Sequence, residues 1–575
     1  GLVGSEMCIR DSSPRRHDLD ALRAVAMLLG ILLHASLAYI GVPWPVQDAS
    51  RAPLLGLLFL AIHGFRMPLF FLVSGFFTAM TWRRRGTLGL LAQRFTRVFV
   101  PLVLASATLL PLFERVIADG ARIAAGKSAS PDPAGTALVA AIRAADADGV
   151  AAALAAGADP DRPDPEFRMR PLSLAAMIGD TEVARTLLDS GASLDARNAD
   201  GRTPLHTAAF AGKVKVVDLL LERGADPAPR GPIGDTPADS ARADEGTTAV
   251  IARAVRVPLG DAESLRAGRE RIRAILAERT GVVDRDPTAP APAAPAGRLE
   301  RIRDAYRTWL GSERFSVTIP PFEEPTALFL GSTLNYLWFL WILCWLVAGF
   351  ALVAAIATAM RLPAPPRNLV TGPAALLWLV PATVVPQCFM GLFIPVFGPD
   401  TSAGLLPQPH VLAYYALFFG YGAILFLSGD DARVGRRWGW LLALACLVCF
   451  PAGLVTLRDP VASALPQALY AWLMCFAAIG FFRCFVSGES RTWRFLSDSA
   501  YWLYLAHLPL VVFLQQVSRD WPGPAAIKCL GVTVVSTAIL LASWRWVVRP
   551  TPLGTLLNGP RRQPAPSRAA SRASS

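Results

Sequence analysis

Residues 15–39 read RRHDLDALRAVAMLLGILLHASLAY, an apolar run of bilayer-spanning length with charged side chains inside it. A helix needs about 20 apolar residues to cross the hydrocarbon core of a membrane. Charged residues within such a run are costly, so they usually face the interior of a helix bundle and mark a functional site. The stretch therefore predicts a membrane helix that contributes to a polar site.

Further apolar runs of similar length predict an all-α, polytopic bundle of ten transmembrane helices. The composition agrees, because 53% of the residues are hydrophobic and only 17% are charged, whereas soluble proteins carry about a quarter charged residues. The predicted spans lie near 19–40, 54–80, 95–113, 329–355, 368–389, 410–428, 438–456, 466–486, 500–517 and 526–547.

Arginines predict the orientation of this bundle. They follow every even-numbered span, as at Arg83 and Arg436, whereas the short intervening loops hold almost none. Lys and Arg collect on cytoplasmic loops, so both termini are predicted to be cytoplasmic. The third span then ends on the other side of the membrane. Residues 114–328 are therefore predicted to form an extracytoplasmic insert, since long domains translocate largely regardless of charge.

The insert contains a repeat of about 33 residues that resembles the ankyrin repeat. The tripeptide GAD at 157–159 recurs as GAS at 191–193 and as GAD at 224–226, and TPLH occupies 203–206. These features predict an all-α ankyrin-repeat solenoid over about 136–255. His206 is then expected to hold the turn of its repeat rather than to act in catalysis. Whether the array also covers the membrane domain as a lid stays open.

These features divide the chain into five parts. Residues 1–12 resemble the translation of a sequencing adapter and are expected to be an artefact. The membrane domain is predicted to comprise 13–113 and 329–550, separated by the insert, and 551–575 to form a disordered cytoplasmic tail.

Asp20, Arg23 and His34 fall within about 60° of one another around the first predicted helix, so they form one polar stripe. Arg23 and His34 are roughly 16 Å apart along the helix axis. This spacing suits a site with an anionic group near the cytoplasm and chemistry deeper in the membrane. The alternative is that Asp20 and Arg23 lie at the interface and that His34 only bonds a backbone carbonyl.

Several segments resemble successive signatures of the integral-membrane acyltransferase family three, and in particular its periplasmic glucan biosynthesis branch. They are RHDLDALRAVAMLLGILLH (16–34), FRMPLFFLVSGFF (65–77), QRFTRVFVPL (93–102), LWFLWIL (337–343), YYALFFGYGAILF (414–426), YWLYLAHLPLV (501–511) and the final LNG (557–559). The most specific of them are the Arg-x10-His pair and the RxxR after the second span. A large ankyrin insert is not part of the ordinary family pattern.

The resemblance implies a bacterial inner-membrane enzyme that transfers acyl groups from cytoplasmic acyl-coenzyme A to hydroxyls of extracytoplasmic carbohydrates, glucans or lipids. It implies that His34 is the catalytic base, a task for which imidazole is suited near neutral pH. It also implies that three arginines bind the donor, which their guanidinium groups can do through its phosphates. They are Arg23, Arg94 and Arg97.

Other residues are possible supports for the acceptor or for the oxyanion. His63 and Arg66 lie at about the depth of His34, although helix packing or an interface contact would equally explain them. Tyr504 and His507 resemble the family's late signature, with structural support and acceptor binding as the two interpretations. Asp20 is too far along the helix axis to orient His34 directly.

The chain is expected to have no tightly bound cofactor and no metal site, because its eight cysteines show no ligand spacing with histidine and most of them lie in apolar stretches. Its net charge of +12 is weak support for nucleic-acid binding, and the chain is not expected to bind nucleic acid. The expected partners are the lipid bilayer, acyl-coenzyme A, a carbohydrate, glucan or lipid-linked acceptor, and a protein bound by the ankyrin repeats.

A multi-span transporter or exporter and a membrane scaffold are the alternative functions. Direct transfer and an acyl-enzyme intermediate are not distinguished by the sequence.

Overall fold

A computed structural model describes residues 16–559 except for short gaps and one longer segment. The gaps are 43, 49, 128–131, 165–168, 199, 232–234, 244–247, 249–251, 253–254, 256, 258–260, 281–297, 319–325, 332, 362, 364–365, 372–373, 393–395, 430–432 and 458. The expected artefact at 1–12 and residues 560–575 of the predicted tail lie outside the described residues.

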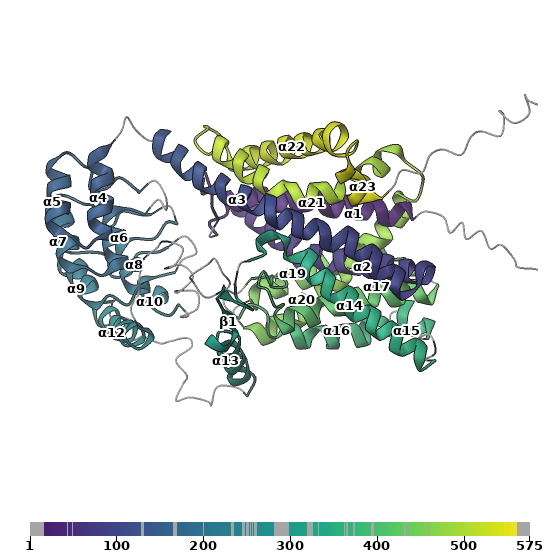
Figure 1. Cartoon of the computed structure of the whole chain (residues 1–575). Coiled ribbons are helices and arrows are strands. Elements are labelled where there is room, and N and C mark those ends of the chain that lie inside the picture. The colour runs from purple at the N-terminus through teal and green to yellow at the C-terminus, as the bar shows by residue number, and fades with distance from the viewer. Residues whose placement is uncertain are drawn as a thin grey trace, which may run out of the picture.

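The described chain forms a bundle of long apolar helices and a separate stack of short helix pairs, each with its own buried core (Figure 1). The fold is all-α apart from one antiparallel pair of two-residue strands, β1 (Ser316–Val317) and β2 (Thr326–Ala327). The bundle helices are α1 (His17–Ser36), α2 (Pro53–Arg94), α3 (Val100–Lys127), α14 (Trp338–Ala359), α15 (Arg367–Thr371), α16 (Ala374–Gln387), α17 (Pro409–Ser428), α18 (Trp438–Leu444), α19 (Phe450–Val455), α20 (Pro460–Phe485), α21 (Arg491–Ser518), α22 (Ala525–Ser543) and α23 (Pro552–Asn558).

Eight helical segments among the described residues are long and apolar enough to span a membrane. One of them, Pro53–Gly120, contains both the second and the third predicted spans, and the fifth predicted span corresponds to α15 and the shorter apolar helix α16. The polytopic α-helical bundle is therefore confirmed. The count is eight rather than ten for two reasons. The second and third predicted spans form one helical segment, and the fifth is divided between α15 and the short helix α16.

The second and third spans are joined without a loop. The helix continues through the arginines at 83–85, and only Gly86, with φ 69°, leaves the helical conformation. A positive φ favours glycine because it has no Cβ. The chain reverses at this residue, since the guanidinium of Arg94 reaches the hydroxyl of Thr78 at 3.0 Å. A continuous helix would separate these residues by roughly 24 Å.

Contacts between helices fix their relative directions. The α1 and α21 helices are parallel, because Arg23 meets Ser497 and His34 meets His507. The α2 helix is antiparallel to α1, because Arg23 lies over the ring of Phe77 and Gly30 lies against Arg66. The α14 helix is parallel to α2, because Phe339 contacts Phe71 and Phe350 contacts Trp82. Alternating directions of this kind are those that the ten-span interpretation requires.

The described insert therefore leaves and re-enters the bundle at the same end, where α1 finishes and where α21 also finishes. Gln516, near the end of α21, donates to the carbonyl oxygen of Val116 in α3, so α3 continues past residue 113 as a bundle helix. The predicted boundary of the insert at residue 114 is too early. The reason is that the third span continues as one helix past Pro111 and up to Lys127.

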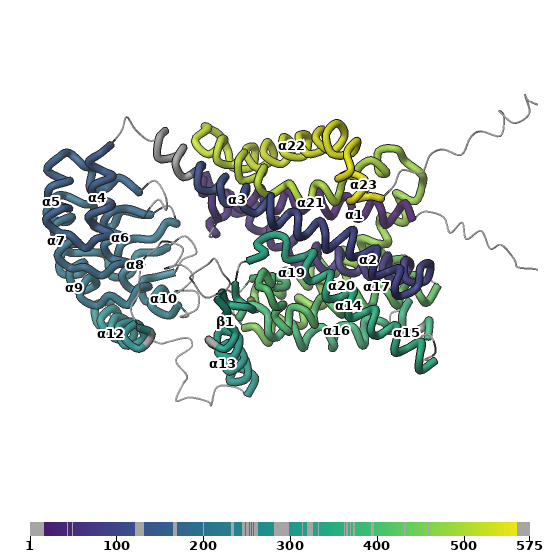
Figure 2. The backbone as a smooth tube through the Cα atoms, viewed as in Figure 1, coloured from purple at the N-terminus to yellow at the C-terminus, as the bar shows by residue number. Residues whose placement is uncertain are grey.

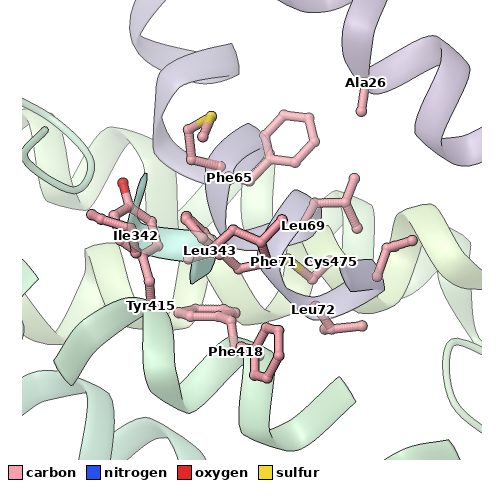
Figure 3. Close-up of a cluster of buried hydrophobic side chains, with 14 of the residues drawn as sticks. Ala26, Phe65, Leu69, Phe71, Leu72, Ile342, Leu343, Tyr415, Phe418 and Cys475 are labelled. Carbon is pink, nitrogen blue, oxygen red and sulfur yellow. The ribbon is translucent and has the colours of Figure 1, made fainter. Parts of the chain in front are cut away.

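The bundle core is rich in aromatic rings and in close helix contacts. Figure 3 shows Phe65 and Phe71 of α2 packed with Leu343 of α14 and Tyr415 of α17. The α2 and α17 helices approach closely where glycines replace side chains. A Cβ at Gly422 would collide with the carbonyl oxygen of Leu72. Small residues permit such close approach in membrane bundles.

The insert has its own core of stacked helix pairs, as the ankyrin pattern predicts. Its helices are α4 (Pro133–Arg143), α5 (Ala147–Ala155), α6 (Pro171–Ile178), α7 (Thr181–Asp189), α8 (Pro204–Phe210), α9 (Val214–Glu222), α10 (Pro237–Ser240) and α12 (Ala262–Thr280). In α8, Thr203 and His206 form a reciprocal capping box, and His206 Nε2 donates to the carbonyl oxygen of Asp235 in the next repeat at 3.3 Å. His206 thus has the structural position expected for it.

The start of the predicted disordered tail is folded. The α23 helix covers 552–558, Leu557 is buried, and the backbone trace in Figure 2 runs close to α21 there. Asn558 donates to the carbonyl oxygen of Asp498 at 2.5 Å. The prediction of disorder is therefore wrong for 551–558, because the apolar Leu557 anchors this segment to the bundle.

Candidate active site

The imidazole of His34 is flanked by two nearly parallel rings. Its centroid lies 5.1 Å from that of His507 with an interplanar angle of 5°, and 6.0 Å from that of Trp44 with an angle of 21°. His34 comes from α1, His507 from α21 and Trp44 from the loop that follows α1. The structure thus brings together two predicted site residues and one that the sequence did not indicate.

His507 is fixed in one tautomer by its own helix. Its Nδ1 lies 2.7 Å from the carbonyl oxygen of Tyr504 and 3.1 Å from that of Leu503. A carbonyl oxygen only accepts, so Nδ1 donates its proton to them. In the neutral ring Nε2 then carries a lone pair, and Nε2 is buried without a hydrogen-bond partner among the described residues.

Trp44 is held over His34 by an amide clamp. Its indole Nε1 donates to Gln515 Oε1 at 2.9 Å, and Gln515 Nε2 donates to the carbonyl oxygens of His34 and Ala35 at 3.0 Å each. The amide therefore ties the end of α1 to the loop and to α21. His34 Nδ1 is itself buried without a hydrogen-bond partner in the described chain.

Arg66 of α2 lies against α1 one turn before His34. A Cβ at Gly30 would collide with Arg66 Nη1, so the glycine leaves room for the guanidinium at this point. Arg66 is near enough to both imidazoles, and His63 to His34, for their charges to interact. The predicted proximity of His63 and Arg66 to His34 is therefore present in the structure.

A second polar group lies about 16 Å away at the other end of α1. Arg23 donates to Ser497 Oγ at 2.8 Å and lies 3.6 Å from Asp20, and Ser497 Oγ donates to the same carboxylate at 3.3 Å. Asp20 thus orients Arg23, and Ser497 was not predicted. Asp20 takes no part near His34, which agrees with the expectation that the two form no dyad.

Arg94 and Arg97 lie beside this group but have different neighbours. Arg94 is the last residue of α2, whereas Arg97 is in a π-helical turn, Phe95–Phe99, that separates their side chains. Arg94 bonds Thr78, and Arg97 lies against Gly559, where a Cβ would collide with its guanidinium. Single π turns are frequent at functional sites. The final LNG segment is therefore part of the arginine-rich end of the bundle.

Tyr504 has a structural contact rather than a free hydroxyl. Its hydroxyl donates to the carbonyl oxygen of Tyr336 at 2.8 Å, which ties α21 to the start of α14. Of the two interpretations for this residue, the structure favours support.

Sequence reasoning missed the residues that position the site from other elements. Trp44 and Gln515 stand alone in their segments, and Ser497 has no spacing that marks it. A buried Asp48–Lys528 ion pair of 2.9 Å near Trp44 was also missed. An Asp and a Lys near span ends with almost no other charge around them were the available signal for that pair. In the described ranges, no group of three His, Cys, Asp or Glu side chains could hold a metal ion.

The sequence of this chain is similar to those of known proteins. A family model described as an acyltransferase domain matches residues 16–139 and 299–544, which is more than half of the chain. The class of protein is thus a multi-pass membrane acyltransferase. The chain belongs to this acyltransferase family, and three ankyrin repeats matched at 137–230 are inserted in its domain.

The family match also revises the predicted boundary at residue 329. It resumes at residue 299, so α13 (Arg298–Leu310) belongs to the acyltransferase domain rather than to the insert. The structure agrees, because Tyr306 of α13 contacts His410 of α17 at 3.1 Å. An isolated short helix beyond a linker gave no sequence signal for this assignment.

Curated relatives include the glucans biosynthesis protein C of Salmonella paratyphi B and of Salmonella heidelberg. Each is 40% identical to this chain over 102 residues, which is 18% of this chain and 27% of the relative. The match thus spans about a quarter of the length of these relatives.

Proposed function

We propose that the chain transfers an acyl group from acyl-coenzyme A to a hydroxyl of a carbohydrate or glucan on the other side of the bacterial inner membrane. The observation that carries the proposal is that polar side chains lie in two groups at different positions along α1 and α21. The group of Arg23, Arg94 and Arg97 is called the arginine level, and the pair of His34 and His507 is called the imidazole level. Arginines lie at one level, and an imidazole pair lies roughly 16 Å away. The family match and the partial similarity to glucans biosynthesis protein C support this choice of reaction and acceptor.

The arginine level is suited to the phosphates of the donor. Arg23 Nε and Arg94 Nε are buried without hydrogen-bond partners among the described residues. Charge-assisted hydrogen bonds from guanidinium groups to phosphate are strong and directional. A donor bound there extends its thioester along α1 towards His34.

The imidazole level is suited to proton transfer. His34 removes the proton of the acceptor hydroxyl as its oxygen attacks the thioester carbonyl carbon. Arg66 is the nearest fixed cation for the developing oxyanion, and such fixed charges are most effective where water is excluded. Asp20 positions Arg23, and His63 lies beside Arg66 on the acceptor side.

In this orientation both termini are cytoplasmic and the ankyrin array is extracytoplasmic, where it recruits the acceptor or a protein partner. Deleting residues 140–280 tests this, because transfer to the native acceptor should fall while hydrolysis of acyl-coenzyme A persists. Loss of both reactions in a folded variant would contradict recruitment.

The reaction is tested with membranes that contain the full chain and radiolabelled acyl-coenzyme A. Label should appear in envelope glucan, and His34→Gln should reduce the rate by about 10²- to 10⁴-fold. His17→Gln is the matched control, because it exchanges the same residue types at the start of the same helix. An undiminished rate for His34→Gln would refute the mechanism.

A further inference from the structure

We propose that His507 and Trp44 stabilise the protonated form of His34 through their π faces, and that both are positioning residues for the catalytic base. The inference rests on the proposed function, because it concerns the proton that His34 takes from the acceptor. It assigns His507 a different task from acceptor binding.

The geometry is that of a cation stacked with two aromatic rings. A cation within about 6 Å of a ring centroid is attracted to the face of the ring, most strongly for Trp. The His34 centroid lies 5.1 Å from His507 and 6.0 Å from Trp44, and both rings are nearly parallel to it. A proton on His34 therefore places positive charge directly against two π systems.

The surroundings of His34 make this stabilisation necessary. In the described part of the chain no Asp or Glu forms an ion pair with His34, and Arg66 places a positive charge nearby. An imidazolium here has no carboxylate to compensate it, and desolvation adds to the cost. The two ring faces are the compensating groups that the structure offers.

In the transfer reaction the acceptor proton goes to His34 because His34 is only partly buried, whereas His507 is 2% exposed. Its Nδ1 proton is committed to the carbonyl oxygens of Leu503 and Tyr504, and its Nε2 is buried without a partner in the described chain. Two stacked imidazolium rings would repel each other at this distance. The pair therefore takes up only one extra proton at a time, and in the transfer reaction this proton is on His34.

The proton balance is complete within the transfer reaction. The acceptor oxygen forms a bond to the carbonyl carbon as its proton moves to His34, and the carbon–sulfur bond of the thioester then breaks. The imidazolium returns the proton to the departing thiolate of coenzyme A. His34 is neutral again, and His507 has not changed its protonation.

Both rings are held in place before the reaction. Gln515 bonds Trp44 Nε1 at 2.9 Å, and the Asp48–Lys528 pair fixes the same loop. Lys528 also donates to the carbonyl oxygen of Arg519 at 3.2 Å. Groups that need no rearrangement during the reaction stabilise a developing charge most effectively.

The test compares leucine and phenylalanine at each position in the full chain, assayed with acetyl-coenzyme A and envelope glucan. Leucine removes the π face, whereas phenylalanine retains it without ring nitrogens. His507→Leu and Trp44→Leu should each lower kcat about tenfold with an unchanged KM for the donor. His507→Phe and Trp44→Phe should recover most of that loss.

Thermal unfolding of each variant in detergent identifies those that are folded, and only folded variants are compared. Equal losses for His507→Phe and His507→Leu would overturn the inference, because the ring nitrogens would then be required. Full activity of His507→Leu would overturn it as well. Wild-type protein that transfers no acyl group would refute the proposed function itself, and with it this inference.

Discussion

Arg94 donates a hydrogen bond to the hydroxyl of Thr78 at 3.0 Å, although the two residues lie 16 positions apart in the chain. The bond spans the reversal at Gly86 and leaves Arg94 Nε free of hydrogen-bond partners within the described residues. Thr78 thus orients Arg94 without using all of its hydrogen-bonding capacity.

Replacing Arg94 by Ala should raise the KM for acyl-coenzyme A by about 10- to 100-fold with a smaller change in kcat. A hydrogen bond to a charged group contributes about 1.5–3 kcal/mol, which corresponds to this range. Steady-state kinetics with varied donor concentration measures the effect. Arg83→Ala is the control, because Arg83 is exposed near the turn. A similar KM for the Arg94 and Arg83 variants would contradict donor binding by Arg94.

The periodicity of α1 was enough to predict the two ends of the site. Arg23 and His34 lie on one helix, so their relation follows from helix geometry alone. The partners Ser497, Trp44 and Gln515 come from other segments, and only packing brings them to α1. No local pattern in a single sequence encodes that packing.

The spans show the same division between local and long-range information. Hydropathy located every apolar segment, and the arginines at 83–85 directly precede the turn between the second and third spans. The continuous helix up to Gly86 could not be predicted, because Arg is a good helix former and an Arg-rich turn reads equally as loop or helix. The α13 helix was assigned to the insert since its contacts with α17 are invisible in sequence.

Adding a methyl group at Gly422 should destabilise the bundle, because its Cβ would collide with the backbone of Leu72 in α2. Overpacking of this kind costs about 1–3 kcal/mol, and backbone contacts leave little room to relax. Gly420→Ala is a matched control in the same helix, since a Cβ there meets no atom within 4 Å in the described structure. Thermal unfolding in detergent should show a lower Tm for Gly422→Ala only. Equal Tm values would contradict the close approach of α2 and α17.

Reporter fusions test the orientation of the bundle. Alkaline phosphatase fused at residue 290 should be active, and a fluorescent protein fused after residue 559 should fluoresce, because the two positions follow opposite ends of the bundle. Both reporters on one side would contradict the helix directions seen here. If each reporter were found on the side predicted for the other, the helix directions would hold, but the proposed orientation of the bundle in the membrane would be contradicted.

The ankyrin array should lose stability as the pH falls below about 6.5, the ordinary pKa of histidine. Burial lowers the pKa of His206, although its bond to the backbone of Asp235 opposes the shift. The unfolded array therefore binds a proton at His206 more readily than the folded array does. The stabilisation of the folded array by neutral His206 is complete above the pKa that His206 has in the unfolded array. It is lost as the pH falls towards the pKa that His206 has in the folded array. Hydrogen exchange over 203–226 in the full chain measures this change.

Two variants of His206 separate its cap from its protonation. His206→Ala removes the capping box with Thr203 and should cost about 1 kcal/mol at neutral pH. His206→Gln restores the Thr-x-x-Gln form of the box, so exchange should stay slow at pH 7 and become insensitive to pH between 5 and about 6.5. If His206→Gln kept the wild-type pH dependence, another group would be responsible. Because His206 lies in α8 of the ankyrin stack, which has its own buried core, neither variant should change the kcat of acyl transfer at neutral pH.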